Sequence, residues 1–150
     1  RVGQWDQALQ GYLRRLEQTK PVVLTGDLNV AHLDQDIYNV GAPHVKKVSG
    51  CTPLERQSFG EVILEPGVRR DAFRHLYPEA LGHYTWWNVR TGARPQNKGL
   101  RLDYFVVTDA LIEVEGDNTT TSPAVVDCYH DYSSTVGISD HCPIMLIMKY

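Results

Sequence analysis

The chain has no excess of basic residues. Its 15 Lys and Arg residues are outnumbered by 18 Asp and Glu residues, which gives a formal charge of -3 over 150 residues. This balance argues against a protein held to nucleic acid by a global positive field, so any such contact must be concentrated on one local face. Secretory leaders, membrane-length apolar runs and repeats are also missing from the sequence, which predicts a soluble intracellular protein without a membrane partner. With 42% hydrophobic residues, the composition suits one globular domain or part of one.

Cysteine is scarce as well. Cys51, Cys128 and Cys142 are odd in number and lack CxxC-type spacing. This favours free thiols in a reducing compartment over disulfides or zinc ligation, and we expect small buried hydrophobic residues. Most histidines also lack zinc-ligand spacing and are expected to be surface or structural residues; they are His32, His44, His75, His83 and His130.

The sequence begins at Arg1, without an initiator methionine, and a helical pattern of apolar residues follows at once. Residues 2–18 are predicted to form an amphipathic helix that ends before Pro21. The abrupt start indicates a piece of a longer protein. A missing part would matter, because a layered domain needs every layer to cover its apolar faces and a site can draw on both halves.

Strands and helices are predicted to alternate along the rest of the chain. Residues 22–25 form a short β-branched run that is typical of a buried strand, and its carboxyl end carries Asp27. Thr52 is a predicted helix cap, with proline in the first turn and Glu55 three residues after the cap. The inner face of that helix is predicted to consist of Leu54, Phe59, Val62 and Ile63. Further predictions are a long functional loop at 32–49, a helical turn at 71–77, strands at 84–87, 102–107, 125–126 and 144–148, a polar loop at 88–99 and a turn at 116–121. The class is therefore α/β or α+β with a mixed sheet, without an internal domain boundary.

Asp27 and Asn29 lie in the motif Gly26-Asp27-Leu28-Asn29, directly after the first predicted strand. In extended chain, residues two apart project to the same side, so both side chains would meet one substrate atom. The aspartate could take a proton from water, and the asparagine could donate hydrogen bonds to a phosphoryl oxygen. Because Gly, Asp and Asn are also turn formers, the motif alone is equally typical of a turn.

Asp103 lies within the apolar run 100–107, where an unpaired carboxylate would cost several kcal/mol. His141 is a candidate partner, because an imidazole that donates to a carboxylate is fixed in orientation and leaves its other nitrogen free for substrate. A salt bridge to Arg101 or Lys98 is the structural alternative.

Asp140 adjoins His141, and neighbours in extended chain face opposite ways, which indicates separate roles. Its carboxylate suits a hard metal such as magnesium, directly or through water. Alternatively, it is a loop cap before the strand that follows Pro143.

Four motifs, in this order and spacing, resemble those of the exonuclease III-like apurinic/apyrimidinic (AP) endonucleases of the endonuclease/exonuclease/phosphatase superfamily. They are residues 26–32, 52–56, 97–104 and 139–143. A GDxN or SDH match alone would indicate only the superfamily. The stretches 73–78 and 84–87, together with 97–104, narrow the resemblance to the abasic-site enzymes, and it extends over nearly the whole chain.

The resemblance implies a four-layered α/β sandwich of the DNase I-like type, with residues 1–150 as the C-terminal half of one catalytic domain that is monomeric when complete. The N-terminal half would supply an asparagine, a metal-binding glutamate and a tyrosine. By the same resemblance, Asp27 orients or deprotonates the attacking water with Asn29 as its companion, Asp103 and His141 contact the scissile phosphate, and Asp140 lies near Mg²⁺, with Mn²⁺ as the alternative.

The resemblance also implies an apolar pocket for a sugar that lacks its base, formed by Trp86, Leu100 and Leu102. A flipped normal nucleotide is too large for such a pocket, and extruding an abasic sugar loses no base stacking. Leu100 stands where some relatives carry tryptophan. Backbone contacts to DNA are expected from Asn39, Lys46 and Lys47, with solvated surface charges as the alternative for the two lysines.

The function expected from these residues is magnesium-dependent incision of double-stranded DNA on the 5′ side of an abasic site, leaving a 3′-hydroxyl, in base excision repair. The 3′-end-processing or exonuclease activity of the family would accompany it. The expected compartment is the nucleus, with the mitochondrion as the alternative. Two other hypotheses remain: the same fold acting on a lipid, inositol phosphate or RNA tail, and a noncatalytic piece that needs its other half.

Overall fold

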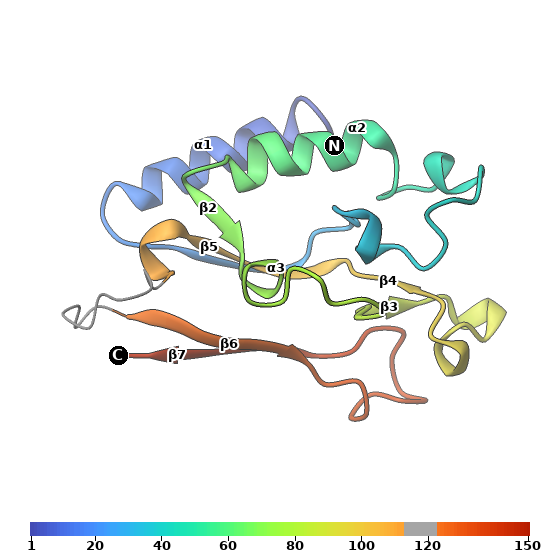
Figure 1. Ribbon diagram of the computed structural model, residues 1–150. Helices are drawn as coiled ribbons and strands as arrows, with labels where there is room; N and C mark the ends of the chain where they lie inside the picture. Colours follow the sequence, from blue (N-terminus) through green and yellow to red (C-terminus); the bar gives the residue numbers. More distant parts are fainter. Residues whose placement is uncertain (113–122) are drawn as a thin grey trace.

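The structure is a computed structural model that describes residues 1–112 and 123–150, and its elements form stacked layers (Figure 1). Helices cover one face of a central sheet, and a separate two-stranded sheet lies on the other side. The helical layer contains α1 (Trp5–Glu17), α2 (Pro53–Ser58) and the π-helical turn that continues α2 (Phe59–Leu64). The central sheet has the order β1 (Val23–Asp27), β5 (Asp103–Thr108) and β2 (Arg69–Asp71), and α3 (Ala72–Leu76) follows β2. The other pairs are β3 (Trp86–Trp87) with β4 (Gly99–Leu100), and β6 (Ala124–His130) with β7 (Ile144–Lys149).

These elements confirm the predicted alternation of helices and strands, with one difference in the sheet. Every strand pair within residues 1–112 and 123–150 is antiparallel, so the expected mixed sheet is not found there. Both neighbours of β5, β1 and β2, run antiparallel to it. A long stretch of chain with several elements connects each of them to β5, rather than a single crossover helix. The turn predicted at 116–121 lies outside the described residues.

The helices pack through fewer residues than the sequence pattern indicated. α1 begins at Trp5 rather than at Val2, and of its predicted apolar face only Leu13 is fully buried, while Trp5 is 47% exposed. In α2, Thr52 accepts a hydrogen bond from the backbone N–H of Glu55, as the capping motif predicted. Leu54 is 61% exposed, so its predicted place on the inner face was wrong. It lies in the first turn of α2, whereas Phe59 and Ile63, which are buried, lie in the π-helical turn that follows.

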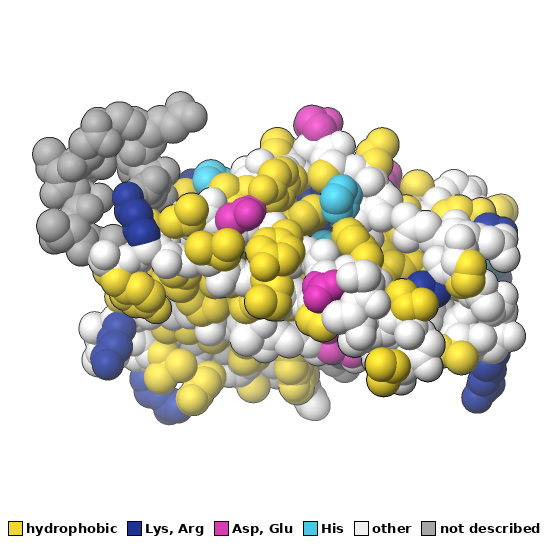
Figure 2. Space-filling model, turned by 90° about the horizontal axis from the view of Figure 1, so that it is seen from below, with side chains coloured by type: hydrophobic (Ala, Val, Ile, Leu, Met, Phe, Trp, Pro, Cys, Tyr) yellow, Lys and Arg dark blue, Asp and Glu magenta, His cyan; other side chains and the backbone are white. Residues whose placement is uncertain are grey.

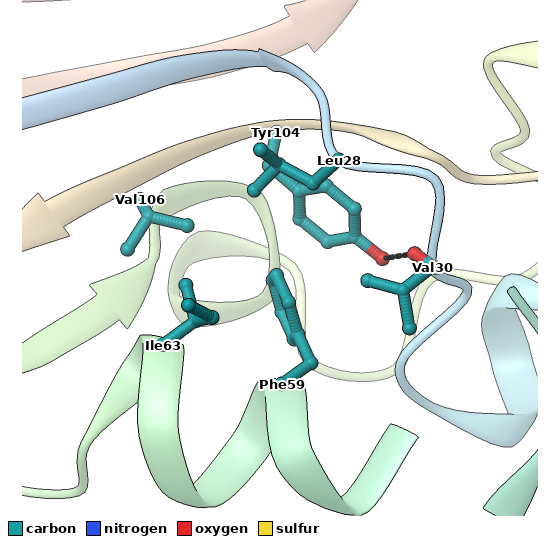
Figure 3. Packing of buried hydrophobic residues seen from close by; sticks show 6 residues of the cluster. All are labelled: Leu28, Val30, Phe59, Ile63, Tyr104 and Val106. Carbon is teal, nitrogen blue, oxygen red and sulfur yellow. Dashed lines mark hydrogen bonds between the residues drawn. The ribbon is translucent and has the colours of Figure 1, made fainter. Parts of the chain in front are cut away.

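The core beneath this helix fixes the end of β1 (Figure 3). Phe59 and Ile63 are 0% exposed and pack against Leu28, Tyr104 and Val30. Burying each such side chain contributes about 1.5–3 kcal/mol. The Tyr104 hydroxyl donates to the Val30 carbonyl at 2.6 Å, which ties the chain that follows Asp27 to β5.

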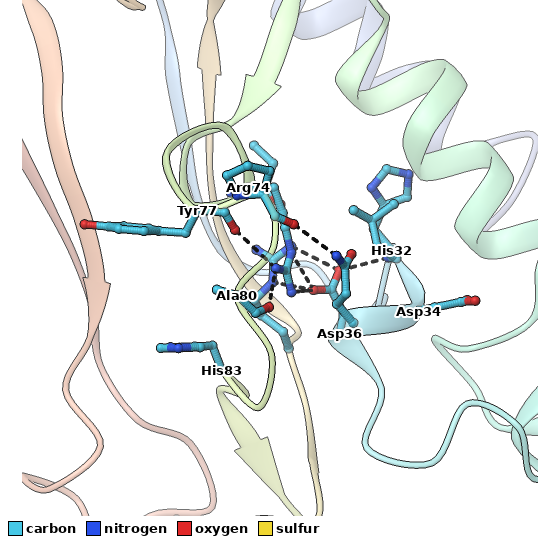
Figure 4. Close-up of polar contacts among 12 residues, drawn as sticks. His32, Asp34, Asp36, Arg74, Tyr77, Ala80 and His83 are labelled. Atoms are coloured by element: carbon cyan, nitrogen blue, oxygen red, sulfur yellow. Dashed lines mark hydrogen bonds and ion pairs between the residues drawn. The ribbon is translucent and has the colours of Figure 1, made fainter.

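A buried charge network fixes the start of the long loop after β1 (Figure 4). The Asp36 carboxylate, 0% exposed, accepts hydrogen bonds from Arg101 at 2.8 Å and from Arg74 at 2.6 Å. Arg101 also pairs with Asp71. Burial alone would raise the pKa of Asp36, but attraction to the two guanidinium groups outweighs it and lowers that pKa. Removing one partner of such a network leaves a buried charge unpaired.

The three cysteines are free and buried, as predicted. Burial raises the pKa of Cys51 to about 11 and that of Cys128 to about 12, so both thiols are protonated at neutral pH and suit packing rather than nucleophilic chemistry. Among the described residues, no helix is both long and apolar enough to cross a membrane.

Candidate active site

Two carboxylates face each other where the central sheet ends. The antiparallel register of β1 and β5 places Asp27 directly opposite Asp103. Side chains at opposed positions lie on the same face of a sheet, and like charges there repel unless a positive group or a metal compensates them. The side chain of Asp27 is 35% exposed and that of Asp103 is 15% exposed. The pair therefore forms an acidic, solvent-accessible edge.

His141 reaches this edge from the chain just before β7. Its Nδ1 lies 2.8 Å from Oδ2 of Asp103, and its Nε2 lies 3.9 Å from Oδ2 of Asp27. Because an ionised carboxylate only accepts hydrogen bonds, Nδ1 carries the proton of the Asp103 contact. The predicted Asp103–His141 pair is thus confirmed, and the second ring nitrogen is directed toward the side of the site occupied by Asp27.

The structural alternatives for Asp103 are not found among the described residues. Arg101 is fully buried and pairs with Asp36 and Asp71 instead. The Lys98 ammonium lies 5.7 Å from the centre of the Tyr38 ring.

Asp27 and Asn29 do meet, although not through extended chain. The Asn29 backbone N–H donates to Oδ1 of Asp27 at 2.8 Å, and its side-chain amide donates to Oδ2 at 3.1 Å. Asn29 has a φ of 50°, a left-handed conformation that asparagine tolerates better than most residues. The turn alternative and the predicted meeting of the side chains are therefore both correct, because the turn brings them together.

The backbone of Gly50 packs against this turn. Its φ is +81°, and a Cβ at this position would lie 2.6 Å from the Asn29 carbonyl oxygen. Its own carbonyl accepts a hydrogen bond from the Ala31 N–H at 2.8 Å. The long loop therefore returns to the end of β1 and packs its backbone against the residues that carry the candidate site.

The Asp140 carboxylate and the backbone of Asp103 each have a hydrogen-bond partner that the sequence did not single out for that role. The indole N–H of Trp86 donates to Oδ2 of Asp140 at 3.0 Å. The hydroxyl of Thr85, which is 0% exposed, accepts hydrogen bonds from the backbone N–H of Leu102 and of Asp103. Asp140 and His141 have separate contacts, as the alternation argument predicted.

The carboxylate of Asp140 is a suitable ligand for a hard cation, but the described residues do not supply enough ligands for a complete metal site. Carboxylate oxygens are preferred by Mg²⁺, yet the described residues contain no cluster of three or more His, Cys, Asp or Glu side chains that could hold a metal ion. A complete metal shell would need water, substrate or further protein ligands beyond those residues.

The residues predicted for the sugar pocket lie beside the candidate site. Trp86 pairs with Leu100 across β3 and β4 and forms an isolated bridge with His141. Leu102 is only 6% exposed and belongs to a buried cluster, so Trp86 and Leu100 offer most of the accessible apolar surface. The predicted DNA-contacting side chains are exposed in the long loop, two of them at the end of a 3-10 turn (Val45–Lys47); they are Asn39, Lys46 and Lys47.

Comparisons with known proteins identify the family of this chain. The model described as "Endonuclease/Exonuclease/phosphatase family" matches residues 1–141. An exodeoxyribonuclease of Bacillus subtilis is 43% identical over 97% of this chain and 52% of its own length. A DNA-(apurinic or apyrimidinic site) endonuclease of Dictyostelium discoideum is 42% identical over 99% of this chain and 37% of its own length.

Two solved structures are also similar to this chain. The AP endonuclease from Leishmania major has a TM-score of 0.84 and 36% identity, covering 99% of this chain and 44% of that one. A 3′ phosphatase from Neisseria, bound to product DNA hairpin, has a TM-score of 0.81 and 26% identity, covering 98% of this chain and 52% of that one. The chain thus spans about half the length, or less, of these relatives. It belongs to the endonuclease/exonuclease/phosphatase family, as a relative of the exonuclease III-like AP endonucleases and exodeoxyribonucleases.

Proposed function

We propose that the protein containing this chain is a metal-dependent DNA repair endonuclease that hydrolyses the phosphodiester on the 5′ side of an abasic site in double-stranded DNA. The product would carry a 3′-hydroxyl. The observation that carries the proposal is the convergence of Asp27, Asn29, Asp103 and His141 at one sheet edge. The relatives add support, because their names describe nucleases and a phosphatase that act on DNA.

In this proposal each group has a role that its chemistry allows. Asp27 is an exposed acceptor that orients or deprotonates the attacking water. One amide hydrogen of Asn29 is directed to Asp27, so the other can donate to a phosphoryl oxygen. With Nδ1 committed to Asp103, the Nε2 atom of His141 contacts the scissile phosphate. Water is the nucleophile, without a covalent enzyme intermediate.

Asp140 is the residue proposed to hold the metal, with its orientation set by Trp86. Bound Mg²⁺, with Mn²⁺ as the alternative, would supply Lewis-acid charge that stabilises the phosphoryl oxygens. Water, the substrate phosphate or protein ligands beyond the described residues would complete the metal shell.

Selectivity for abasic DNA would follow from the apolar surface beside the phosphate site. Trp86 and Leu100 are half-buried neighbours on adjacent strands, and Leu102 closes the cluster from inside. A sugar without its base can enter a pocket that a full nucleotide cannot, and its extrusion loses no stacking.

The outer surface of the β6–β7 sheet supports a second half for this domain. Hydrophobic side chains gather on the face seen from below (Figure 2). Exposed apolar residues of β6 and β7 include Val126 at 51%, Tyr129 at 42%, Met145 at 43% and Ile147 at 45%. An apolar sheet face needs cover from another layer, which agrees with a four-layered sandwich in which residues 1–150 are the C-terminal half and the N-terminal half completes the active site.

A substrate panel tests this proposal with the complete protein. The substrates are an abasic-site duplex, the same duplex without the lesion, a duplex with a blocked 3′ end, an inositol phosphate and an RNA tail. The expected result is Mg²⁺-dependent incision of the abasic duplex on the 5′ side of the lesion, abolished by EDTA. Faster turnover of the inositol phosphate or RNA would overturn the proposed substrate. The isolated 150 residues are expected to be inactive, and incision by them alone would contradict the need for a second half.

A further inference from the structure

The segment that delivers Asp140 and His141 to the active site has little hydrophobic anchoring after Tyr132. It is the loop 131–141 between β6 and β7, and its apolar residues Val136 and Ile138 are 63% and 84% exposed. These two residues line a hollow of about 1050 Å³ that also reaches the Trp87 ring. Tyr132 packs against the buried cluster that contains Trp87 and anchors the start of the loop, whereas the part of the loop that carries Asp140 and His141 is held by polar contacts.

Those contacts converge on Arg94, the first residue of the 3-10 turn Arg94–Gln96. Its Nη1 donates to the carbonyl oxygens of Ser139 at 2.8 Å, Thr135 at 3.1 Å and His141 at 3.3 Å. Its Nη2 donates to the Tyr132 carbonyl at 2.9 Å and to the Thr135 hydroxyl at 3.0 Å. One guanidinium group thus contacts both ends of the loop.

Thr135 strengthens the same arrangement. Its hydroxyl accepts from Arg94 and donates to the His141 carbonyl at 2.6 Å. The backbone of His141 is therefore held by the arginine directly and through the threonine. Because the imidazole of His141 must stay within 2.8 Å of Asp103, its backbone position decides whether the other ring nitrogen faces the phosphate site.

The side chain of Arg94 is itself held by the ring of Trp87. Its guanidinium carbon lies 4.6 Å from the centre of the Trp87 ring. The Trp87 indole N–H donates to Asn97 at 3.1 Å, and its backbone N–H donates to the Asp140 carbonyl at 2.9 Å. None of the ion pairs found among residues 1–112 and 123–150 involves Arg94. The N–H groups of its guanidinium donate hydrogen bonds to the loop instead.

We propose that Arg94 is a positioning residue for catalysis: its guanidinium sets the location of the His141 imidazole and the Asp140 carboxylate by holding residues 132–141. The inference rests on the proposed function of that site. A lysine cannot replace it, because an ammonium group has three donors on a point charge and cannot lie flat on Trp87 while reaching both ends of the loop.

The first test measures incision of an abasic duplex by the complete protein with Arg94→Lys or Arg94→Ala. Displacing a catalytic group by about 1 Å costs on the order of 100-fold in rate, so kcat is expected to fall about 100-fold in both variants with little change in KM, because Arg94 faces protein groups. Added ethylguanidinium should restore part of the kcat of Arg94→Ala but none of that of His141→Asn. The matched control is Arg15→Met on the exposed surface of α1, which should cut like wild type.

The second test measures amide hydrogen exchange over residues 132–141, which does not depend on activity. Exchange there should be faster in Arg94→Ala than in wild type, while exchange in β1 and β5 is unchanged. If exchange is faster in Arg94→Ala but wild type does not cut the abasic duplex, Arg94 still positions the loop and the proposed function is rejected. Unchanged exchange, or an unchanged kcat in Arg94→Lys beside an active wild type, would overturn the positioning role.

A milder variant keeps the inference testable if Arg94→Ala does not fold. Thr135→Val preserves the shape of the side chain and removes only the hydroxyl between Arg94 and His141. Its kcat is expected to fall by about 10-fold, in keeping with the loss of the two hydrogen bonds that this hydroxyl makes. A kcat equal to that of wild type would count against the proposal.

Discussion

Acidification should weaken the fold through His130, which links α3 to the β6–β7 sheet. Its side chain is stacked on Phe73 at 4.5 Å and its Nδ1 lies 3.1 Å from the Tyr132 hydroxyl. Burial lowers the pKa of His130 from 6.5 to about 3, with a further contribution from the positive charge of Arg101. The folded state therefore keeps this imidazole neutral at a pH at which the unfolded chain protonates it.

The sign and size of the effect follow from proton linkage. A histidine whose pKa is lowered on folding contributes stability that is complete above pH 6.5 and is lost as the pH falls toward 3. At 1.36 kcal/mol per pKa unit, the loss reaches about 2 kcal/mol at pH 5 and about 5 kcal/mol below pH 3. His32 and His83 are shifted in the same direction by burial, so a reference variant is needed.

The assay is urea denaturation of the complete protein at pH 7.5 and pH 5.0, for wild type and for His130→Asn. Asparagine keeps a polar atom near the Tyr132 hydroxyl but does not titrate. The variant is less stable at both pH values because the Phe73 stack is lost, yet its loss between the two should be smaller than that of wild type by about 2 kcal/mol. Equal losses in the two proteins would refute the reasoning.

Three further substitutions test other parts of the structure. Gly50→Ala places a Cβ 2.6 Å from a backbone oxygen at a φ of +81°. It should destabilise the fold by about 1–3 kcal/mol and slow incision, as measured by denaturation and by rate assays. Gly11→Ala is the control, because open space surrounds Gly11, and it should neither destabilise the fold nor slow incision. Trp86→Phe removes the N–H bound to Asp140 and should raise the half-saturating Mg²⁺ concentration by about 10-fold in an activity titration; an unchanged value would deny the indole its orienting role. Arg101→Met leaves buried carboxylates without their main partner and should cost about 3–5 kcal/mol in denaturation, so a loss below about 1 kcal/mol would show that the network is dispensable.

The chemistry-bearing residues were predictable from the sequence because local rules and a simple cost argument point to them. A β-branched run that ends in Gly26-Asp27 predicts a carboxylate at a strand end, and β1 ends at Asp27. A carboxylate within an apolar run needs a partner, and Asp103 has His141. The meeting of Asp27 and Asn29 was also expected, but its geometry was not, since the left-handed φ of Asn29 depends on the backbone that packs against it.

The supporting contacts could not be predicted, because they join segments that are distant in sequence. Arg101 was a candidate partner for Asp103, yet the fold buries it beside Asp36 and Asp71. Arg94 lies in a loop that looked merely polar, and its importance follows only from the place of residues 132–141. The inner face of α2 was wrong at Leu54 for the same reason, since periodicity does not show which turns of a helix pack against the core.

The central claim is that Asp27 and His141 act on one phosphate, and the most direct measurement is single-turnover incision of an abasic duplex by the complete protein. Wild type is compared with Asp27→Asn, which keeps the side-chain size, and with His141→Asn; both variants remove the acid–base group. Both variants should fold, bind the duplex and cut about 10²–10⁴-fold more slowly than wild type. Cutting at the wild-type rate by either variant would contradict the role assigned to that residue, and undiminished cutting by both would contradict the account.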